Sequence, residues 1–331
     1  MPPAMAPPLL AVDGLTVEFA AGRRTARVLS GVSLTVARGE TLGIVGESGC
    51  GKSMTALAIL RLVPSPPGNI SAGSVRLHGE VLLAASDARI RDVRGNRIAM
   101  IFQEPMTALN PVFTVGDQIA EGLGRHLGLA AGPARARAIE LLAAVGIPAP
   151  GQRVDEYPHQ LSGGMRPRVM IAMAIACEPE LLIADEPTTA LDVTVQAQIL
   201  DLMRQLQEEM GMAILIISHD LGVIADLAEE VVVMYAGKVV ERGAAEAVFY
   251  DPQHPYTRGL LRAAPVMGQP SQERLYSIPG TVPSPLAMPR GCAFRPRCPE
   301  RFARCVEPPE LIEIHPRHLA RCWAREAETH A

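Results

Sequence analysis

Apolar and polar residues alternate along most of the chain in two patterns, one typical of strands and one typical of helices. From about residue 10 to residue 250, short β-branched apolar runs are followed by segments in which apolar residues recur every three or four positions. This alternation predicts an α/β fold. The predicted strands cover residues 15–19, 32–36, 41–45, 98–102, 181–184, 213–217 and 231–234. The predicted helices follow Lys52, Thr114, Ala134, Ser162, Val193 and Asp220.

Two segments depart from this alternation. The proline-rich residues 64–68 interrupt the first helical segment, and a short hairpin is predicted behind them at 74–83. After about Thr257, prolines become frequent and helical periodicity fades. The C-terminal part is therefore expected to be an irregular appendage that needs a cross-link or a metal to hold it together.

The composition places the chain among folded globular proteins. Of its 331 residues, 48% are hydrophobic and 20% are charged, which excludes a disordered or collagen-like chain. The net charge of −4 argues against a general nucleic-acid binder, because phosphate contacts need a surplus of basic residues. The apolar run at 169–177 is far shorter than the roughly 18 to 20 residues that cross a bilayer. No Lys or Arg precedes Arg23, so no secretory signal is expected and the chain is interpreted as cytosolic.

A glycine-rich loop lies directly between a predicted strand and a predicted helix. Its residues are Gly46, Glu47, Ser48, Gly49, Cys50, Gly51, Lys52, Ser53 and, entering the helix, Met54. Glycines let backbone N–H groups surround phosphates, a lysine reaches the β- and γ-phosphates, and a serine hydroxyl can ligate Mg²⁺. The loop therefore predicts a nucleotide site. Its lysine is one of only two in the chain, among 31 basic residues.

Two adjacent carboxylates end a second apolar strand. Asp185 and Glu186 follow Leu181–Ala184. A carboxylate at the end of a buried strand can hold Mg²⁺ through water, and its neighbour can position or deprotonate an attacking water. We therefore expect Asp185 to bind the metal and Glu186 to act as the base.

A second glycine turn, Ser162, Gly163 and Gly164, precedes the helical pattern VMIAMAIAC at 169–177. Ser162 is expected at the helix N-cap, and the amides that follow form a possible anion site. The simpler interpretation is an ordinary capped helix.

The order of these motifs resembles the ATP-binding subunits of ABC transporters over roughly residues 10–260. It includes Gln103, Leu191-Asp192 and His219 beside the motifs above. Within that superfamily, IFQEPMTALNP (101–111), LSGGMRPRVMIAMAIA (161–176) and HPYTRGLL (254–261) resemble the oligopeptide and dipeptide importers. The resemblance implies a P-loop ATPase with a mixed sheet and a helical subdomain at about 104–178. The domains are expected at 1–260, the ATP-binding domain, and at 261–331, a cysteine-rich extension.

The resemblance also implies roles for single residues. Phe19 would stack on adenine, with a strand aromatic of the core as the alternative. Gln103 would reach Mg²⁺ and the attacking water, and His219 would contact the γ-phosphate and orient Glu186. Asp192 would lie at a subunit interface, although a helix N-cap before Val193 is the simpler interpretation.

In the family two such subunits pair head to tail, so that Ser162–Gly164 of one close over the ATP bound to the other. ATP hydrolysis then opens the dimer, and transmembrane subunits follow that change. The expected partners are a related second ATPase, two permease subunits contacted through residues 104–125, and indirectly an extracytoplasmic solute-binding protein. The expected location is the cytoplasmic face of the inner membrane. Pro167 stands where the branch usually has glutamine, which leaves the angle of the signature helix open.

The extension carries Cys292, Cys298, Cys305 and Cys322. In a reducing compartment, four thiolates suggest zinc or an iron–sulfur cluster rather than disulfides. The tight Cys-x2-Cys pairs of a zinc ribbon are absent, and a [4Fe-4S] cluster accepts looser spacings. Resemblance to the peptide-importer tail also favours the cluster, with Zn²⁺ or free thiols as alternatives. Cys50 and Cys177 are expected to be packing residues.

The resemblance therefore implies ATP hydrolysis that drives import of di- or oligopeptides. Nickel chelates, glutathione and oligosaccharides are alternative solutes, because this subunit need not touch its cargo. A soluble ABC ATPase acting on nucleic acid or ribosomes is a different alternative, and the single cassette without a coiled-coil insertion argues against it. A subunit that binds ATP without hydrolysing it is a third, against which Glu186 and His219 argue.

Overall fold

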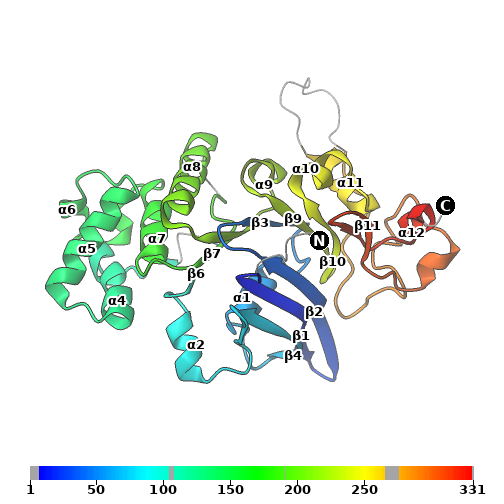
Figure 1. The fold of residues 1–331 in the computed structure, drawn as a ribbon, viewed down its shortest axis with the longest axis horizontal. Helices are drawn as coiled ribbons and strands as arrows, with labels where there is room; N and C mark the ends of the chain where they lie inside the picture. The colour runs from blue at the N-terminus through cyan, green and yellow to red at the C-terminus, as the bar shows by residue number, and fades with distance from the viewer. Residues whose placement is uncertain (1–6, 104–107, 190, 265–275, 330–331) are drawn as a thin grey trace. The chain divides into compact units, whose positions relative to one another are not determined.

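The computed structural model describes residues 7–103, 108–189, 191–264 and 276–329 (Figure 1). The chain divides into two compact units. Unit 1 contains Met1–Val36, Thr41–Leu83 and Ser218–Ala331, and unit 2 contains Ala37–Glu40 and Ala84–Ile217. Within the part that the structure describes, no helix is both long and apolar enough to cross a membrane.

An antiparallel sheet forms the N-terminal part of unit 1. Its strands are ordered β2 (Arg24–Val36), β1 (Leu10–Ala21), β4 (Gly68–Leu77) and β5 (Glu80–Val81). The strands predicted at 15–19 and 32–36 and the hairpin predicted at 74–83 are confirmed, although β1 and β2 are much longer than expected. They lengthen because they pair with each other along nearly their whole length, a contact that a local pattern does not contain.

The strand predicted at 41–45 is β3 (Thr41–Val45), which is completely buried and leads into the glycine loop and α1 (Lys52–Ile59). It pairs in parallel with β9 (Glu230–Tyr235), and β9 pairs antiparallel with β10 (Lys238–Ala244), which the pattern did not predict. The helices of this region are α9 (Leu221–Leu227), α10 (Ala245–Tyr250) and α11 (Pro255–Ala263). Parallel and antiparallel pairings thus coexist, as the predicted mixed sheet requires.

The C-terminal residues contain more regular structure than the proline pattern suggests. They form η2 (Ala303–Val306), β11 (Ile312–His315), β12 (His318–Ala320) and α12 (Trp323–Thr329). Strand β12 pairs with β10, and β11 pairs with β12. The extension therefore continues a sheet of unit 1, which supplies the pairing that these short strands could not provide alone.

Unit 2 contains the parallel strands β6 (Ile98–Ile101), β7 (Leu181–Asp185) and β8 (Ala213–Ile217). Strands β7 and β8 are fully buried, in line with the continuous apolar runs that identified them. The larger helices are α4 (Val115–Leu127), α5 (Ala131–Ala144), α7 (Met165–Ile175) and α8 (Val193–Met210). Figure 1 shows α4, α5 and α7 packed together, within the range expected for a helical subdomain. The described part of the unit also contains the short helices α2 (Asp87–Val93), α6 (Pro150–Arg153) and η1 (Pro158–Gln160).

Candidate functional site

The glycine loop has a backbone that only glycine can adopt at two positions. Gly46 has φ 151°, and a Cβ there would lie 2.3 Å from the Met234 carbonyl oxygen and 2.7 Å from the Cys50 Sγ. Gly51, the N-cap of α1, has φ 108°. The loop is therefore packed against β9 at Gly46 and against Leu29 of β2 at Gly51, where a Cβ would lie 2.7 Å from the Leu29 Cδ2. The loop leads into the N-terminus of α1, which is a favourable place for an anion, although the Glu47 and Cys50 amides already donate to the Tyr256 hydroxyl and the Glu47 carbonyl.

Lys52 is the first residue of α1 and is only 5% exposed. Its Nζ donates hydrogen bonds to the Gly46 carbonyl at 2.7 Å and to the Glu47 carbonyl at 3.3 Å. The ammonium is thus folded back over the loop that leads to it, where it can meet a phosphate held by the loop amides. Cys50 is fully buried, as expected for a packing residue, and burial raises the pKa of its thiol.

Unit 1 also contains Phe19 and His219. Phe19 lies in β1 opposite Ala26 and Gly68 and is only partly buried, so it is not a core aromatic. His219 is exposed and follows Ser218, whose backbone N–H donates to the Ile44 carbonyl of β3 at 3.2 Å. Since β3 runs into the glycine loop, this hydrogen bond places the beginning of the His219 segment beside the strand that carries the loop.

A second cluster of polar side chains lies at the end of β7 in unit 2. Asp185 is 3% exposed, and Glu186 follows it with φ 50°, in the left-handed region. The Gln103 Nε2 donates to Glu186 Oε2 at 3.1 Å, and the Thr189 hydroxyl donates to the same oxygen at 2.9 Å. The structure therefore brings Gln103 and Glu186 together, and their expected roles at Mg²⁺ and the attacking water stay predictions. Thr189 was missed, although its position three residues after Glu186 was a usable signal.

The signature segment corrects one local prediction. Ser162 is not the N-cap: helix α7 begins at Met165 with Gly164 as its cap and without a side-chain cap. The Ser162 carbonyl instead accepts from the Met165 and Arg166 amides at 3.1 and 3.4 Å. A turn therefore precedes the helix, and Gly164 already has helical backbone angles. Ser162 and Gly163, which lie in this turn, are exposed.

Pro167 does not interrupt α7. It is the third residue of a helix that continues to Ile175, where its missing N–H is one of the amides that lack an intrahelical partner in any case. Asp192 accepts from the Val195 amide at 2.9 Å and caps α8. This is the simpler of the two roles expected for Asp192, and it leaves the other as a prediction.

The four cysteines of the extension line one small cavity of about 20 Å³, together with His254, Phe294 and Trp323. Burial raises the pKa of Cys292, Cys322 and Cys298, the last to about 11, and neighbouring thiolates add to the effect. Among the described residues, however, no three His, Cys, Asp or Glu side chains are close enough to hold one metal ion. The donor chemistry thus fits a thiolate-bound group, while the spacing does not form a single-ion site.

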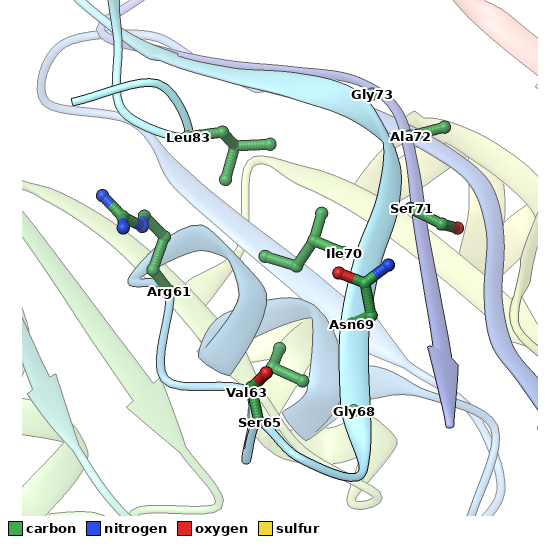
Figure 2. A pocket seen from close by; sticks show the side chains of 10 residues that line it. All are labelled: Arg61, Val63, Ser65, Gly68, Asn69, Ile70, Ser71, Ala72, Gly73 and Leu83. Atoms are coloured by element: carbon green, nitrogen blue, oxygen red, sulfur yellow. The ribbon is translucent and has the colours of Figure 1, made fainter. Parts of the chain in front are cut away.

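A separate hollow of about 460 Å³ lies in unit 1 along β4 (Figure 2). Arg61, Asn69 and Ile70 are among the side chains that border it. None of the residues expected to bind nucleotide lines this hollow, so it adds nothing to the site described above.

The chain matches two family models. Residues 29–189 match "ABC transporter", and residues 240–305 match "Oligopeptide/dipeptide transporter, C-terminal region". It is 52% identical to a Sinorhizobium fredii protein named "Probable peptide ABC transporter ATP-binding protein", over 95% of this chain and 94% of that one. The chain belongs to the ATP-binding subunits of ABC transporters. A Brucella abortus protein named "Putative peptide import ATP-binding protein" is 50% identical over 96% of this chain and 95% of its own length.

Solved structures agree with this family. The dimeric structure of a bacterial ABC transporter cassette is similar with a TM-score of 0.64 and 27% identity, covering 71% of this chain and 98% of that one. The same cassette in a post-hydrolysis state bound to ADP and Pi matches equally well. A cbiO1 protein from Clostridium perfringens matches with a TM-score of 0.62 and 27% identity, covering 74% of this chain and 92% of that one. The ABC ATPase fold is confirmed.

Proposed function

We propose that this ABC ATPase energises the import of di- or oligopeptides. The match of residues 240–305 to the C-terminal region of oligopeptide/dipeptide transporters carries the proposal, because that region lies outside the part shared with other ABC ATPases. Two relatives support it at 52% and 50% identity over nearly the whole chain, the first named as a probable peptide ABC transporter ATP-binding protein and the second as a putative peptide import ATP-binding protein. Residues 1–260 would form the ATP-binding domain, and residues 261–331 the extension.

In this proposal the nucleotide phosphates are bound by the loop Gly46–Ser53. The amides at the N-terminus of α1 would supply hydrogen bonds, Lys52 would supply positive charge, and Ser53, Asp185 and Gln103 would be the residues that hold Mg²⁺. The bound metal neutralises charge that develops on the phosphates. Phe19, half-buried and near Gly68, would stack on the adenine ring.

Hydrolysis would depend on Glu186. Its Oε2 accepts two hydrogen bonds, from Gln103 and Thr189, and these bonds fix the carboxylate in one orientation. A carboxylate held in this way can orient an attacking water and accept its proton. His219 would contact the γ-phosphate and hold Glu186 in line with it.

A complete site would need a second ATPase chain. Ser162 and Gly163 are exposed ahead of α7, so they are accessible to a nucleotide bound by a partner. The similar cassette with a dimeric structure supports this arrangement, and we propose a related rather than identical partner. Val112 and Phe113 are 70% and 52% exposed, and a permease subunit at the membrane's cytoplasmic face would cover them. A solute-binding protein outside the membrane would deliver the cargo.

The four cysteines would hold a [4Fe-4S] cluster, with Zn²⁺ as the alternative. Their convergence on one small cavity supports a shared ligand, and the absence of tight Cys-x2-Cys pairs from the sequence of the extension favours the cluster over zinc. The cluster would supply thiolate–iron bonds that fold the extension. The thiols would lose their protons on binding it.

The test of cargo is solute uptake by cells whose chromosomal copy carries Glu186→Gln. Uptake of radiolabelled tri- and pentapeptides should fall to the level of a deletion strain, whereas uptake of labelled nickel, glutathione and maltooligosaccharide should remain. Loss of one of those solutes with peptide uptake intact would overturn the peptide assignment. The exposed Glu208→Gln is the matched control.

A further inference from the structure

Arg297 connects the extension to the glycine loop. It lies between Cys292 and Cys298 in the sequence, 250 residues from Glu47, and both residues belong to unit 1. The Arg297 Nη1 and Nη2 donate to the two Glu47 carboxylate oxygens at 2.7 and 2.9 Å. The Arg297 side chain is only 4% exposed, so this bidentate pair is shielded from water on the arginine side.

Three further hydrogen bonds hold the guanidinium in this position. Its Nε donates to the Pro279 carbonyl at 2.9 Å, and Nη2 also donates to the Ile278 carbonyl at 3.2 Å. Nη1 lies 3.4 Å from the Tyr235 hydroxyl oxygen, to which it donates. The hydrogen bonds to Glu47 and Tyr235 raise the pKa of Arg297 further, so the residue is a permanent cation.

The backbone of Glu47 is fixed as well. Its N–H donates to the hydroxyl of Tyr256 in α11 at 2.8 Å. Tyr256 is fully buried and packs against Tyr235 and Phe294, with ring centroids 4.6 and 5.4 Å apart. One loop residue is therefore held at its amide by α11 and at its carboxylate by the extension, and both supports rest on the same aromatic cluster.

Glu47 places a negative charge in a loop whose ligand is a polyanion. Without a cation beside it, this carboxylate would repel phosphate and could swing toward Lys52, whose Nζ already contacts the Glu47 carbonyl. Arg297 removes both effects, because it neutralises the carboxylate and holds it away from the phosphate side of the loop. We propose that Arg297 is a positioning residue of the nucleotide site, through which the C-terminal extension sets the affinity for ATP and ADP.

This inference rests on the proposed role of Gly46–Ser53 as the phosphate-binding loop. It predicts that Arg297→Ala weakens binding of ADP about tenfold or more, raises KM for ATP to a similar degree and changes kcat less than twofold. Arg297→Lys keeps the charge but cannot form the bidentate pair, so its loss should be intermediate. The exposed Arg301→Ala, in the same extension, should leave ADP binding unchanged.

The decisive experiment is a double-mutant cycle on the full-length protein, with ADP affinity measured by titration calorimetry and melting temperature measured in parallel. If Arg297 acts through Glu47, the double variant Arg297→Ala/Glu47→Gln should bind ADP at least threefold more tightly than the two single losses multiplied together predict. A general structural role would instead lower the melting temperature and give multiplicative losses.

Lys52→Ala separates failure of this inference from failure of the site assignment. If Lys52→Ala abolishes ADP binding while Arg297→Ala stays within twofold of the unsubstituted protein, the inference is wrong and the site assignment stands. If Lys52→Ala binds ADP normally, the loop is not the nucleotide site and both fail. Should Arg297→Ala not fold, the cycle is measured with Arg297→Lys and Glu47→Gln, and multiplicative losses overturn the inference.

Discussion

The side-chain amide of Gln103 and the hydroxyl of Thr189 donate to the same carboxylate oxygen of Glu186. Gln103 precedes Glu186 by 83 residues, and Thr189 follows it by three. Gln103 follows β6, whereas Thr189 lies in the turn after β7. Both parallel strands end at the same edge of their sheet, so the two donors converge on one carboxylate. Such convergence orients a base without neutralising it.

Glu186→Gln should slow ATP hydrolysis by about 100-fold or more, because an amide cannot accept a proton from water. Nucleotide affinity should change little, since the substitution preserves shape and removes no phosphate contact. Steady-state phosphate release together with ADP titration checks both. If Glu186→Gln keeps more than a third of the turnover of the unsubstituted protein, Glu186 is not the base. Glu208→Gln, at an exposed position, is the control for the loss of one carboxylate.

Thr189→Val should reduce kcat roughly threefold to tenfold and leave KM for ATP unchanged. Valine matches the shape of threonine but cannot donate a hydrogen bond, so the Glu186 carboxylate would lose one of its two supports. The comparison requires initial rates over a range of ATP concentrations. Thr189→Ser restores a hydroxyl and is expected to recover most of the rate. An increase in KM alone would indicate that Thr189 binds nucleotide instead of orienting Glu186.

Sequence patterns predicted the local elements that carry the candidate site better than they predicted the contacts between distant residues. The loop Gly46–Ser53 and the pair Asp185–Glu186 were found because strand, loop and helix follow one another directly, and local order determines their geometry. Arg297 could not be assigned in this way. Its partner Glu47 lies 250 residues earlier, and nothing near Arg297 distinguishes it from the other arginines of the extension.

The two other failures have the same physical origin. Strand β10 was missed because its glutamate and arginine break the apolar pattern, yet Glu241 is completely buried and accepts from the amides of Gln253 and His254. Ser162 was placed at a helix start because serine often caps helices, whereas the two glycines behind it allowed an additional turn. At β10, tertiary hydrogen bonds to Glu241 outweighed the local pattern. At Ser162, the glycine backbone outweighed the capping preference of serine.

His254 should make the protein less stable as the pH falls below about 6.5. The ring is buried, and this burial lowers its pKa to about 4 despite the opposing charge of Glu241. Between pH 6.5 and 4 the unfolded chain therefore binds more protons at this residue than the folded chain, so acidification favours unfolding. The full effect is about 3 kcal/mol below pH 4, from 1.36 kcal/mol per pKa unit.

His254→Asn isolates this contribution. The His254 Nδ1 accepts from the Tyr256 amide at 3.0 Å as the N-cap of α11, and an asparagine oxygen can replace that acceptor without titrating in this range. Urea unfolding at pH 7.5 and pH 5 should show a loss of stability that is about 2 kcal/mol smaller in the variant. Equal losses in the two proteins would mean that His254 is not kept neutral by burial. His219→Asn, an exposed position, should leave the difference unchanged.

Anaerobically purified protein should contain about four irons per chain and show a broad absorption band near 400 nm. Cys298→Ser should remove both, because Cys298 is one of the four thiols around the shared cavity and serine is a poor ligand for iron. Cys177→Ser is the matched control. The Cys177 thiol lies in unit 2, 3.6 Å from the Gly122 carbonyl oxygen, so the iron content should not change.

One zinc per chain would instead identify Zn²⁺ as the ligand. If the protein contains no metal and Cys298→Ser has the same melting temperature, the four thiols hold no ligand. The ABC ATPase assignment does not depend on this outcome, since the residues that carry it lie before residue 220.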